Sequence, residues 1–254
     1  MSRALLSLTL ALIPLSNVFS AEVTFRSRPE QVSLVELYTS EGCSSCPPAE
    51  TWLADLRRDP GLWTDFVPIA FHVNYWDHLG WRDVFATREF TQREYRYAEA
   101  WGSASVYTPC FVRNGEEWKS RSRPAPKRSM TQVGELAVTP SGSGEFRVAF
   151  SPHPAANNLP AKLEVSVALL GGGITSSIRA GENSGKELRH EFVVLALTTV
   201  TLARSSDGKF AAAVHVVAPT DRAFPTMARR ALAAWISPAS TLMPLQATGG
   251  WLEP

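Results

Sequence analysis

The stretch VELYTSEGCSSCPP, residues 35–48, decides how the rest of the chain is read. It starts with β-branched and aromatic residues, which are typical of a buried strand, and continues into TSEG, which is typical of a turn. Cys43 and Cys46 then enclose two serines that are suitable helix caps, and the two prolines that follow suit a first helical turn. We therefore predict a strand, a loop and a helix in this order, with both cysteines at the helix N-terminus.

The next segments extend this order into an α/β pattern. Residues 67–76 (VPIAFHVNYW) are nearly all apolar, which predicts a central strand covered on both faces. Residues 90–101 predict a helix that ends at a glycine, and residues 110–115 (CFVRNG) predict a strand that closes on an Asn-Gly turn. Thr108 and Pro109 lie directly before this last strand.

The motifs GCSSCPP, after a strand, and YTP, before a strand, resemble the thioredoxin superfamily. In that superfamily the proline of the second motif is cis and packs beside the disulfide. More narrowly, VELYTSEGCSSCPPAE, FHVNYWDHLGWRD, VYTPCFVRNG and RAGENSGKELRH resemble an uncharacterised family of secreted bacterial proteins. The resemblance implies a thioredoxin-like core and a β-rich C-terminal region.

The predicted fold class is accordingly an α/β thioredoxin-like domain, residues 30–120, followed by a smaller and mainly antiparallel β domain, residues 131–254. A basic, proline-bearing stretch that starts RSRPAPKR predicts the linker, residues 121–130. Beyond it, β-rich runs separated by turn residues predict strands. These runs are residues 146–150, 162–170, 188–201 and 210–217, with residues 228–236 forming either a strand or a short helix.

The N-terminus has the pattern of a secretory signal peptide, residues 1–20: a basic residue, an apolar run broken by a proline, and small residues near the end. The apolar run is well short of the ~20 residues that span a bilayer, and no later segment is long and apolar enough. We therefore expect a periplasmic or secreted protein with no membrane span in the mature chain. The 25 basic and 24 acidic residues nearly cancel without forming a basic stripe, which argues against nucleic acid as a partner.

Four residues besides Cys43 take roles from the thioredoxin resemblance. Cys43 is the attacking thiol, stabilised as a thiolate by the helix N-terminus, and Cys46 is the resolving thiol. Thr108 and Pro109 bind an extended client peptide beside the sulfur atoms. Glu36, on the preceding strand, is a candidate acceptor for the proton of the resolving cysteine, although it is one residue out of the superfamily's register.

Each role has a simpler alternative. The cysteine pair also suits a structural disulfide that ties the loop to the helix. The Thr-Pro pair suits an ordinary trans turn, and Glu36 suits a buried carboxylate that serves structure alone. His72 alternates with apolar residues along its strand, which favours a hydrogen-bonded core residue. Trp76 and Trp81 are most simply packing residues.

Three residues depart from the patterns that the chain resembles. Gly42 stands where thioredoxins carry an aromatic residue, which argues against general protein reduction. Within the narrower family, Asn74 replaces an Asp and Cys110 replaces a Gln. Cys110 is either a small buried side chain that faces away from the pair or a third thiol able to exchange with it.

The leading functional hypothesis is an extracytoplasmic thiol-disulfide oxidoreductase that acts on thiols or disulfides of exported proteins, without a cofactor. A structural zinc site is not expected, because neither a second CxxC nor a suitable histidine pair is present. One alternative is a soft-metal protein that binds Cu(I) through Cys43 and Cys46 with Cys110, His72 or His78, although no methionine lies near the pair. Another is a binding module with a purely structural disulfide.

Overall fold

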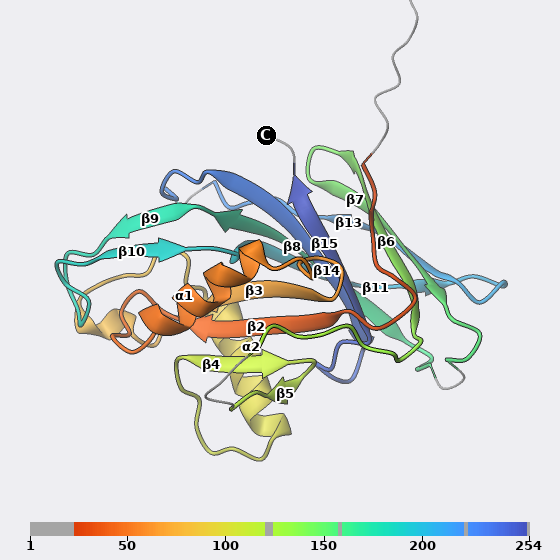
Figure 1. The fold of residues 1–254 in the computed structure, drawn as a ribbon, viewed down its shortest axis with the longest axis horizontal. Helices are drawn as coiled ribbons and strands as arrows, with labels where there is room; N and C mark the ends of the chain where they lie inside the picture. Colours follow the sequence, from red (N-terminus) through yellow and green to blue (C-terminus); the bar gives the residue numbers. More distant parts are fainter. Residues whose placement is uncertain (1–22, 120–123, 157–158, 221–222, 253–254) are drawn as a thin grey trace, which may run out of the picture.

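The computed structural model describes residues 23–119, 124–156, 159–220 and 223–252 (Figure 1). The first group of strands is β1 (Phe25–Arg26), β2 (Ser33–Thr39), β3 (Phe66–His72), β4 (Cys110–Arg113) and β5 (Glu116–Glu117). The second group is β6 (Gly134–Gly142), β7 (Glu145–Pro152), β8 (Leu163–Gly172), β9 (Ile174–Ser177), β10 (Glu187–His190), β11 (Val193–Thr201), β12 (Ala203–Arg204), β13 (Phe210–His215), β14 (Arg229–Pro238) and β15 (Gln246–Leu252). The helices of this part of the chain are α1 (Pro47–Asp55), α2 (Arg88–Ala100) and the short 3-10 turns η1 (Leu56–Arg58) and η2 (Asp77–Leu79).

One large mixed sheet combines strands from both ends of the chain. Its order is β15-β14-β8-β11-β3-β2-β4-β5, in which β3 is parallel to both β2 and β11 and the other pairs are antiparallel. A second, antiparallel sheet has the order β1-β6-β7-β13-β12, and β9 pairs with β10 as a separate hairpin. The predicted fold class, an α/β thioredoxin-like domain followed by a smaller β domain, is therefore wrong: the molecule is mostly β, and its largest sheet is a mixed one to which both halves of the chain contribute.

The reason for this error lies at β3. Its apolar sequence correctly predicted a strand with a neighbour on each side, but one neighbour comes from far along the chain. The amide of Ala70 donates to the carbonyl of Phe192 at 2.8 Å, where β11 joins β3. Periodicity within a strand identifies its buried faces and does not identify its partners.

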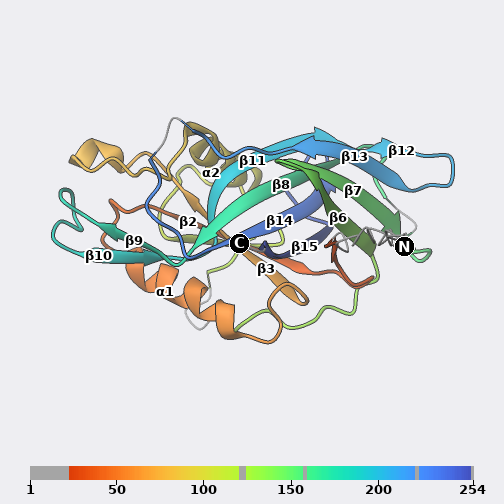
Figure 2. The same ribbon diagram turned by 90° about the horizontal axis from the view of Figure 1, so that it is seen from above.

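The two helices cover opposite faces of the β2-β3-β4 part of the large sheet (Figures 1 and 2). On the α2 side, the ring of Tyr38 contacts that of Tyr97 edge-on, with centroids 6.1 Å apart. On the α1 side, the hydroxyl of Thr39 donates to Glu50 at 2.7 Å. Successive residues of a strand face opposite ways, so Tyr38 contacts α2 and Thr39, the next residue, contacts α1.

Two apolar clusters hold the layers together. The first lies between the helices and the large sheet, and its members from late in the sequence include Leu170, Phe192 and Trp235. The second joins the five-stranded sheet to β8 and β14, where Phe150 and Leu232 are both fully buried. Both clusters therefore contain side chains of β8 and β14, so the two sheets share their packing.

Most of the predicted elements exist with modest shifts. The strand predicted at residues 67–76 ends at His72, and the helix predicted at residues 90–101 spans Arg88–Ala100 with the side chain of Thr87 accepting from the amide of Phe90 at 3.0 Å. The single strand predicted at residues 188–201 is two strands, β10 and β11, separated at Phe192, which has a positive φ of 58°. Residues 228–236 form a strand, β14, and not a helix.

Two predictions concern residues that the structure describes only partly or not at all. The signal peptide predicted for residues 1–20 lies outside the described residues. Of the linker predicted for residues 121–130, residues 124–130 are described, and they belong to neither a helix nor a strand. No helix in the described part of the chain is long and apolar enough to cross a membrane.

Candidate functional site

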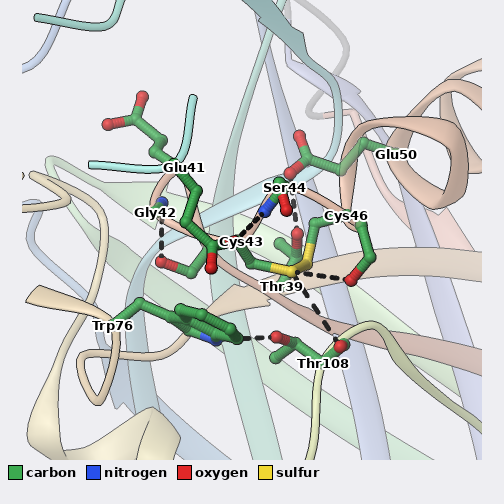
Figure 3. Close-up of a disulfide and its surroundings, with 12 residues drawn as sticks. Thr39, Glu41, Gly42, Cys43, Ser44, Cys46, Glu50, Trp76 and Thr108 are labelled. Carbon is green, nitrogen blue, oxygen red and sulfur yellow. Dashed lines mark hydrogen bonds between the residues drawn. A yellow bond between two sulfur atoms is a disulfide. The ribbon is translucent and has the colours of Figure 1, made fainter. Parts of the chain in front are cut away.

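Cys43 and Cys46 form a disulfide at the start of α1, with Cα atoms 5.5 Å apart (Figure 3). Cys43 lies in the loop after β2, where its amide donates to the carbonyl of Ser40 at 3.1 Å. Cys46 itself is the N-cap residue, so the predicted caps Ser44 and Ser45 are not the caps of this helix. The first amides of a helix lack intrahelical acceptors, and this end therefore carries partial positive charge that favours a thiolate.

The loop that holds Cys43 packs against the indole of Trp76. A Cβ added to Gly42 would lie only 2.9 Å from the Cβ of Trp76, so any side chain there would force the two segments apart. The ring nitrogen of Trp76 donates to the hydroxyl of Thr108 at 2.8 Å (Figure 3). Trp76 thus fills the space next to Gly42 and connects the cysteine loop to the segment before β4.

Thr108 and Pro109 lie beside the disulfide, as predicted for a client-binding edge. The peptide bond between them is cis. The sulfur of Cys43 lies 3.9 Å from the carbonyl oxygen of Thr108 and 3.3 Å from the hydroxyl of Ser45, which can donate to it. The structure therefore brings together two of the predicted site segments, the cysteine pair and the Thr-Pro pair. It places beside them Trp76, which was predicted only to pack.

Both cysteines are fully buried, each with 0% exposure, and the connection between β9 and β10 covers their loop. The side-chain amide of Asn183 donates to the carbonyl oxygens of Glu41 and Cys43, at 2.8 and 2.9 Å. The amide of Ser44 donates to the carboxylate of Glu182 at 2.9 Å. We name residues 178–186 the covering connection; they contain the GENSG part of the RAGENSGKELRH motif.

Glu36, the predicted proton acceptor, lies on the α2 side of the sheet. It is fully buried and its carboxylate accepts from the guanidinium of Arg93 at 2.9 Å and from the hydroxyls of Tyr38 and Tyr97. The burial of Tyr97, next to Glu36, raises the pKa of that phenol well above its usual value, so the phenol remains a donor. This is the arrangement of a structural ion pair, and the described contacts of Glu36 do not include the disulfide.

Cys110 lies in a separate pocket near the C-terminal half of α2. It is 2% exposed and borders Glu94 and Tyr107 in a small cavity. Burial, with a smaller contribution from the Glu94 charge, raises the pKa of its thiol to about 12. A thiol with this pKa is protonated at neutral pH, which makes Cys110 a poor partner for exchange.

A buried polar cluster lies on the α1 side of the large sheet, and sequence patterns barely indicated it. Its members share almost complete burial: Glu41, Glu50, His72, Asp83 and His190. His72 Nδ1 lies 2.7 Å from Asp83, and His190 contacts Glu50 through Nδ1 and Glu41, at 3.2 Å, through Nε2. The ring nitrogen of Trp81 donates to Glu41 at 2.7 Å, so this tryptophan does more than pack.

Carboxylates and histidines face one another in this cluster and shift each other's pKa values. Burial alone would lower the pKa of His190, but the carboxylates of Glu50 and Glu41 outweigh it and raise that pKa to about 10. Burial is outweighed in the same way at His72, where Asp83 raises the pKa of the ring. The pKa values of Glu50 and Asp83 are lowered against the effect of burial, because each carboxylate faces a histidine. The His190 ring therefore carries a proton at neutral pH when nothing else is bound.

One sequence signal could have indicated part of this cluster. Glu50 follows Cys46 by four residues, which places both on one face of the helix. Neither His190 nor Asp83 has a second potential ligand at a diagnostic spacing in the sequence. Only the tertiary fold brings these two residues into the cluster that contains Glu50. His72, interpreted as a hydrogen-bonded core residue, is fully buried and hydrogen-bonded as that interpretation requires.

Residues 34–236 match the family described as "Protein of unknown function (DUF1223)". The chain belongs to this family. The resemblance to an uncharacterised family is thereby confirmed, and the matched residues contain the disulfide, the covering connection and the buried cluster. No protein with a curated description matches the chain.

Two solved structures are similar to the chain. One is the X-ray crystal structure of a protein from Agrobacterium tumefaciens, with 22% identity and a TM-score of 0.57 over 89% of this chain and 99% of that one. The other is HBP35 of Porphyromonas gingivalis, with 14% identity and a TM-score of 0.58 over 89% of this chain and 76% of that one. At these identities the likeness concerns the fold alone.

Proposed function

We propose that this protein carries out thiol-disulfide exchange through Cys43 and Cys46 with cysteines of a protein client. The observation that supports the proposal best is the position of the disulfide, at the N-terminal end of α1 and 3.9 Å from the backbone of Thr108. We further propose an extracytoplasmic location, periplasmic or secreted, because disulfides persist in such compartments and the N-terminal sequence has the pattern of a signal peptide.

The helix N-terminus gives Cys43 the environment of an attacking thiol. Its thiolate attacks one sulfur of a client disulfide, a Cys43–client disulfide forms and the other client sulfur leaves as a thiolate. The thiolate of Cys46 then attacks the sulfur of Cys43, which closes the intramolecular disulfide and releases the second client thiolate. Two electrons pass from the pair to the client in this direction, and the reverse sequence oxidises a client dithiol.

Thr108 and Pro109 supply the surface on which the client lies. An extended peptide next to Thr108 can form backbone hydrogen bonds there, and a cysteine in that peptide is then close to Cys43. Since Trp76 donates to the hydroxyl of Thr108, the tryptophan fixes this edge relative to the cysteine loop. Binding therefore depends on backbone contacts, which suits clients of varied sequence.

A second candidate function is a binding module in which the disulfide is structural. The observation that favours it is the complete burial of both cysteines beneath the covering connection. Exchange with a client requires this connection or the serine-bearing loop to move, whereas a structural disulfide requires no movement. The two candidates therefore differ in whether the pair reacts in the folded protein.

A trapping experiment separates them. Reduced protein carrying Cys110→Ser together with Cys46→Ser is mixed with glutathione disulfide, and adducts are counted by intact mass. The exchange proposal predicts a stable mixed disulfide at Cys43, because the resolving thiol is missing. The matched protein with Cys43→Ser and Cys110→Ser should react at least tenfold more slowly. Equal, slow labelling of both proteins would contradict the proposal and favour the structural disulfide.

A further inference from the structure

We propose that Glu50, His72 and His190 form a binding site for a divalent transition-metal ion, of which Zn²⁺ is the best fit. One donor atom from each side chain lies within 4.8 Å of the other two. All three side chains are buried and come from distant parts of the chain: α1, the end of β3 and the end of β10. The site is distinct from the copper set considered from the sequence, since it uses nitrogen and oxygen donors and no cysteine.

The unused ring nitrogen of His72 provides independent support. Its Nε2 is fully buried and has no hydrogen-bond partner among the described residues, although a buried polar atom without a partner is costly. The other ring nitrogen is fixed by Asp83 at 2.7 Å, so the ring cannot turn to improve the contact of Nε2. Nε2 is therefore oriented toward the cluster and available as a ligand.

The surroundings also match what metal-binding histidines need. A histidine ligand usually has its second ring nitrogen on a carboxylate, which fixes the ring and raises its basicity. His72 meets this condition through Asp83, which is hydrogen-bonded to Nδ1. At His190, Nδ1 faces Glu50, and Glu41 lies at ion-pair distance, 3.2 Å, from Nε2 without forming a hydrogen bond among the described residues. Glu50 in turn accepts a hydrogen bond from Thr39 at 2.7 Å.

The donor set selects the class of ion. Two imidazoles and one carboxylate form a set that Zn²⁺ commonly occupies with bonds of about 2.0–2.2 Å, leaving a fourth position for water or another ligand. A tetrahedral ion with such bonds needs donors about 3.4 Å apart, so the side chains need only small movements to reach it.

The test uses protein with the Cys43–Cys46 disulfide intact and Cys110→Ser, so that no thiol can bind the probe. After treatment with a chelator, Zn²⁺ is titrated in competition with a chromophoric chelator. We expect one Zn²⁺ per chain, an affinity at least 100-fold lower for His72→Gln and for His190→Gln, and a loss of 10- to 100-fold for Asp83→Asn. His215→Gln changes an exposed histidine on β13 and should have no effect.

Co²⁺ provides a measurement that needs no substitution in the cluster and remains informative if a variant fails to fold. Bound Co²⁺ should give the intense visible absorption of a tetrahedral site, displaced by one equivalent of Zn²⁺. Wild-type protein that binds no Zn²⁺ at micromolar concentration would overturn the proposal and leave a buried ion-pair network. Unchanged affinity in both folded histidine variants, or a Co²⁺ spectrum like that of the aqueous ion, would overturn it as well.

Discussion

At the scale of single residues, the role of each buried carboxylate depends on which face of the sheet it occupies. Glu36 is on a strand that leads to the cysteines, yet its side chain points to α2 and pairs with Arg93. Glu50, from α1, lies on the other face with His190 and Thr39. The predicted acid, Glu36, therefore contacts α2, whereas the acid that contacts Thr39 and His190 is Glu50.

Glu94 is a buried acid whose effect on stability can be measured. Burial raises its pKa from 4.5 to about 8. Its Oε2 accepts from Tyr75, and its Oε1 has no hydrogen-bond partner in the part of the chain that the structure describes. Between these two pH values the unfolded chain has released the proton and the folded chain has kept it. The free energy of unfolding contributed by this group therefore falls as pH rises from about 4.5 to 8, by on the order of 5 kcal/mol.

We accordingly expect Glu94→Gln to remove this loss, because the amide does not ionise and still accepts from Tyr75. Urea unfolding at pH of about 5 and about 8.5 should show that wild type loses several kcal/mol more than the variant over this interval. Glu99→Gln, at an exposed position of the same helix, is the control and should follow wild type. If wild type and Glu94→Gln lose the same free energy of unfolding between these two pH values, the pKa of Glu94 is not raised as described.

At the scale of structural elements, the covering connection relates the late part of the chain to the cysteine loop. It leads from β9 to β10, and β10 also carries His190 into the buried cluster. Asn183 is fully buried and its amide satisfies two carbonyl groups of the loop. This connection therefore controls access to the disulfide if the pair reacts with clients.

Asn183→Ala tests that control. The substitution leaves two loop carbonyls without their donor, which costs about 1–3 kcal/mol and weakens the closed arrangement. Since 1.4 kcal/mol corresponds to a factor of ten, we expect reduction of the Cys43–Cys46 disulfide by dithiothreitol to be about tenfold faster or more. The measurement is the rate of thiol release in the folded protein, with folding checked by near-ultraviolet circular dichroism.

Ser184→Ala is the matched control within the same connection. Its hydroxyl donates to the carbonyl of Arg179 at 3.2 Å and makes no described contact with the cysteine loop. This variant should be reduced at the wild-type rate. If Asn183→Ala is also reduced at that rate, the covering connection does not limit access, and the loop with Ser44 and Ser45 must open by itself.

At the scale of the whole molecule, the shared sheet makes the two halves of the chain depend on each other. The core between helices and sheet contains Leu170, Phe192 and Trp235, which all follow the predicted linker. Removing them would expose β3 along one edge and uncover much of the apolar surface of β2 and β3. The thermodynamic unit is therefore expected to include strands from both halves.

A chain that ends at residue 130 tests this dependence. We expect it to lack a cooperative unfolding transition in urea, whereas the full chain should unfold in one transition with the same midpoint by tryptophan fluorescence and by circular dichroism. An independently folded fragment with a sharp transition would instead support the domain boundaries predicted from the sequence.

The sequence predicted local structure well, because its signals are local. The strand before Cys43, the helix after Cys46 and the β-rich runs of the second half follow from composition, spacing and turn residues. The pairing of β3 with β11 does not follow from them, since any apolar strand edge could accept another strand. The cysteines and Thr108 were identified from their motifs, whereas His190 required the fold.

The reduction potential of the Cys43–Cys46 pair tests the central claim most directly. Protein without residues 1–20 and with Cys110→Ser is equilibrated in graded thiol buffers, and its free thiols are counted by mass. The exchange proposal predicts a potential between roughly −270 and −120 mV, the range of CxxC proteins that exchange disulfides. A potential below about −300 mV is that of a structural disulfide and would contradict it.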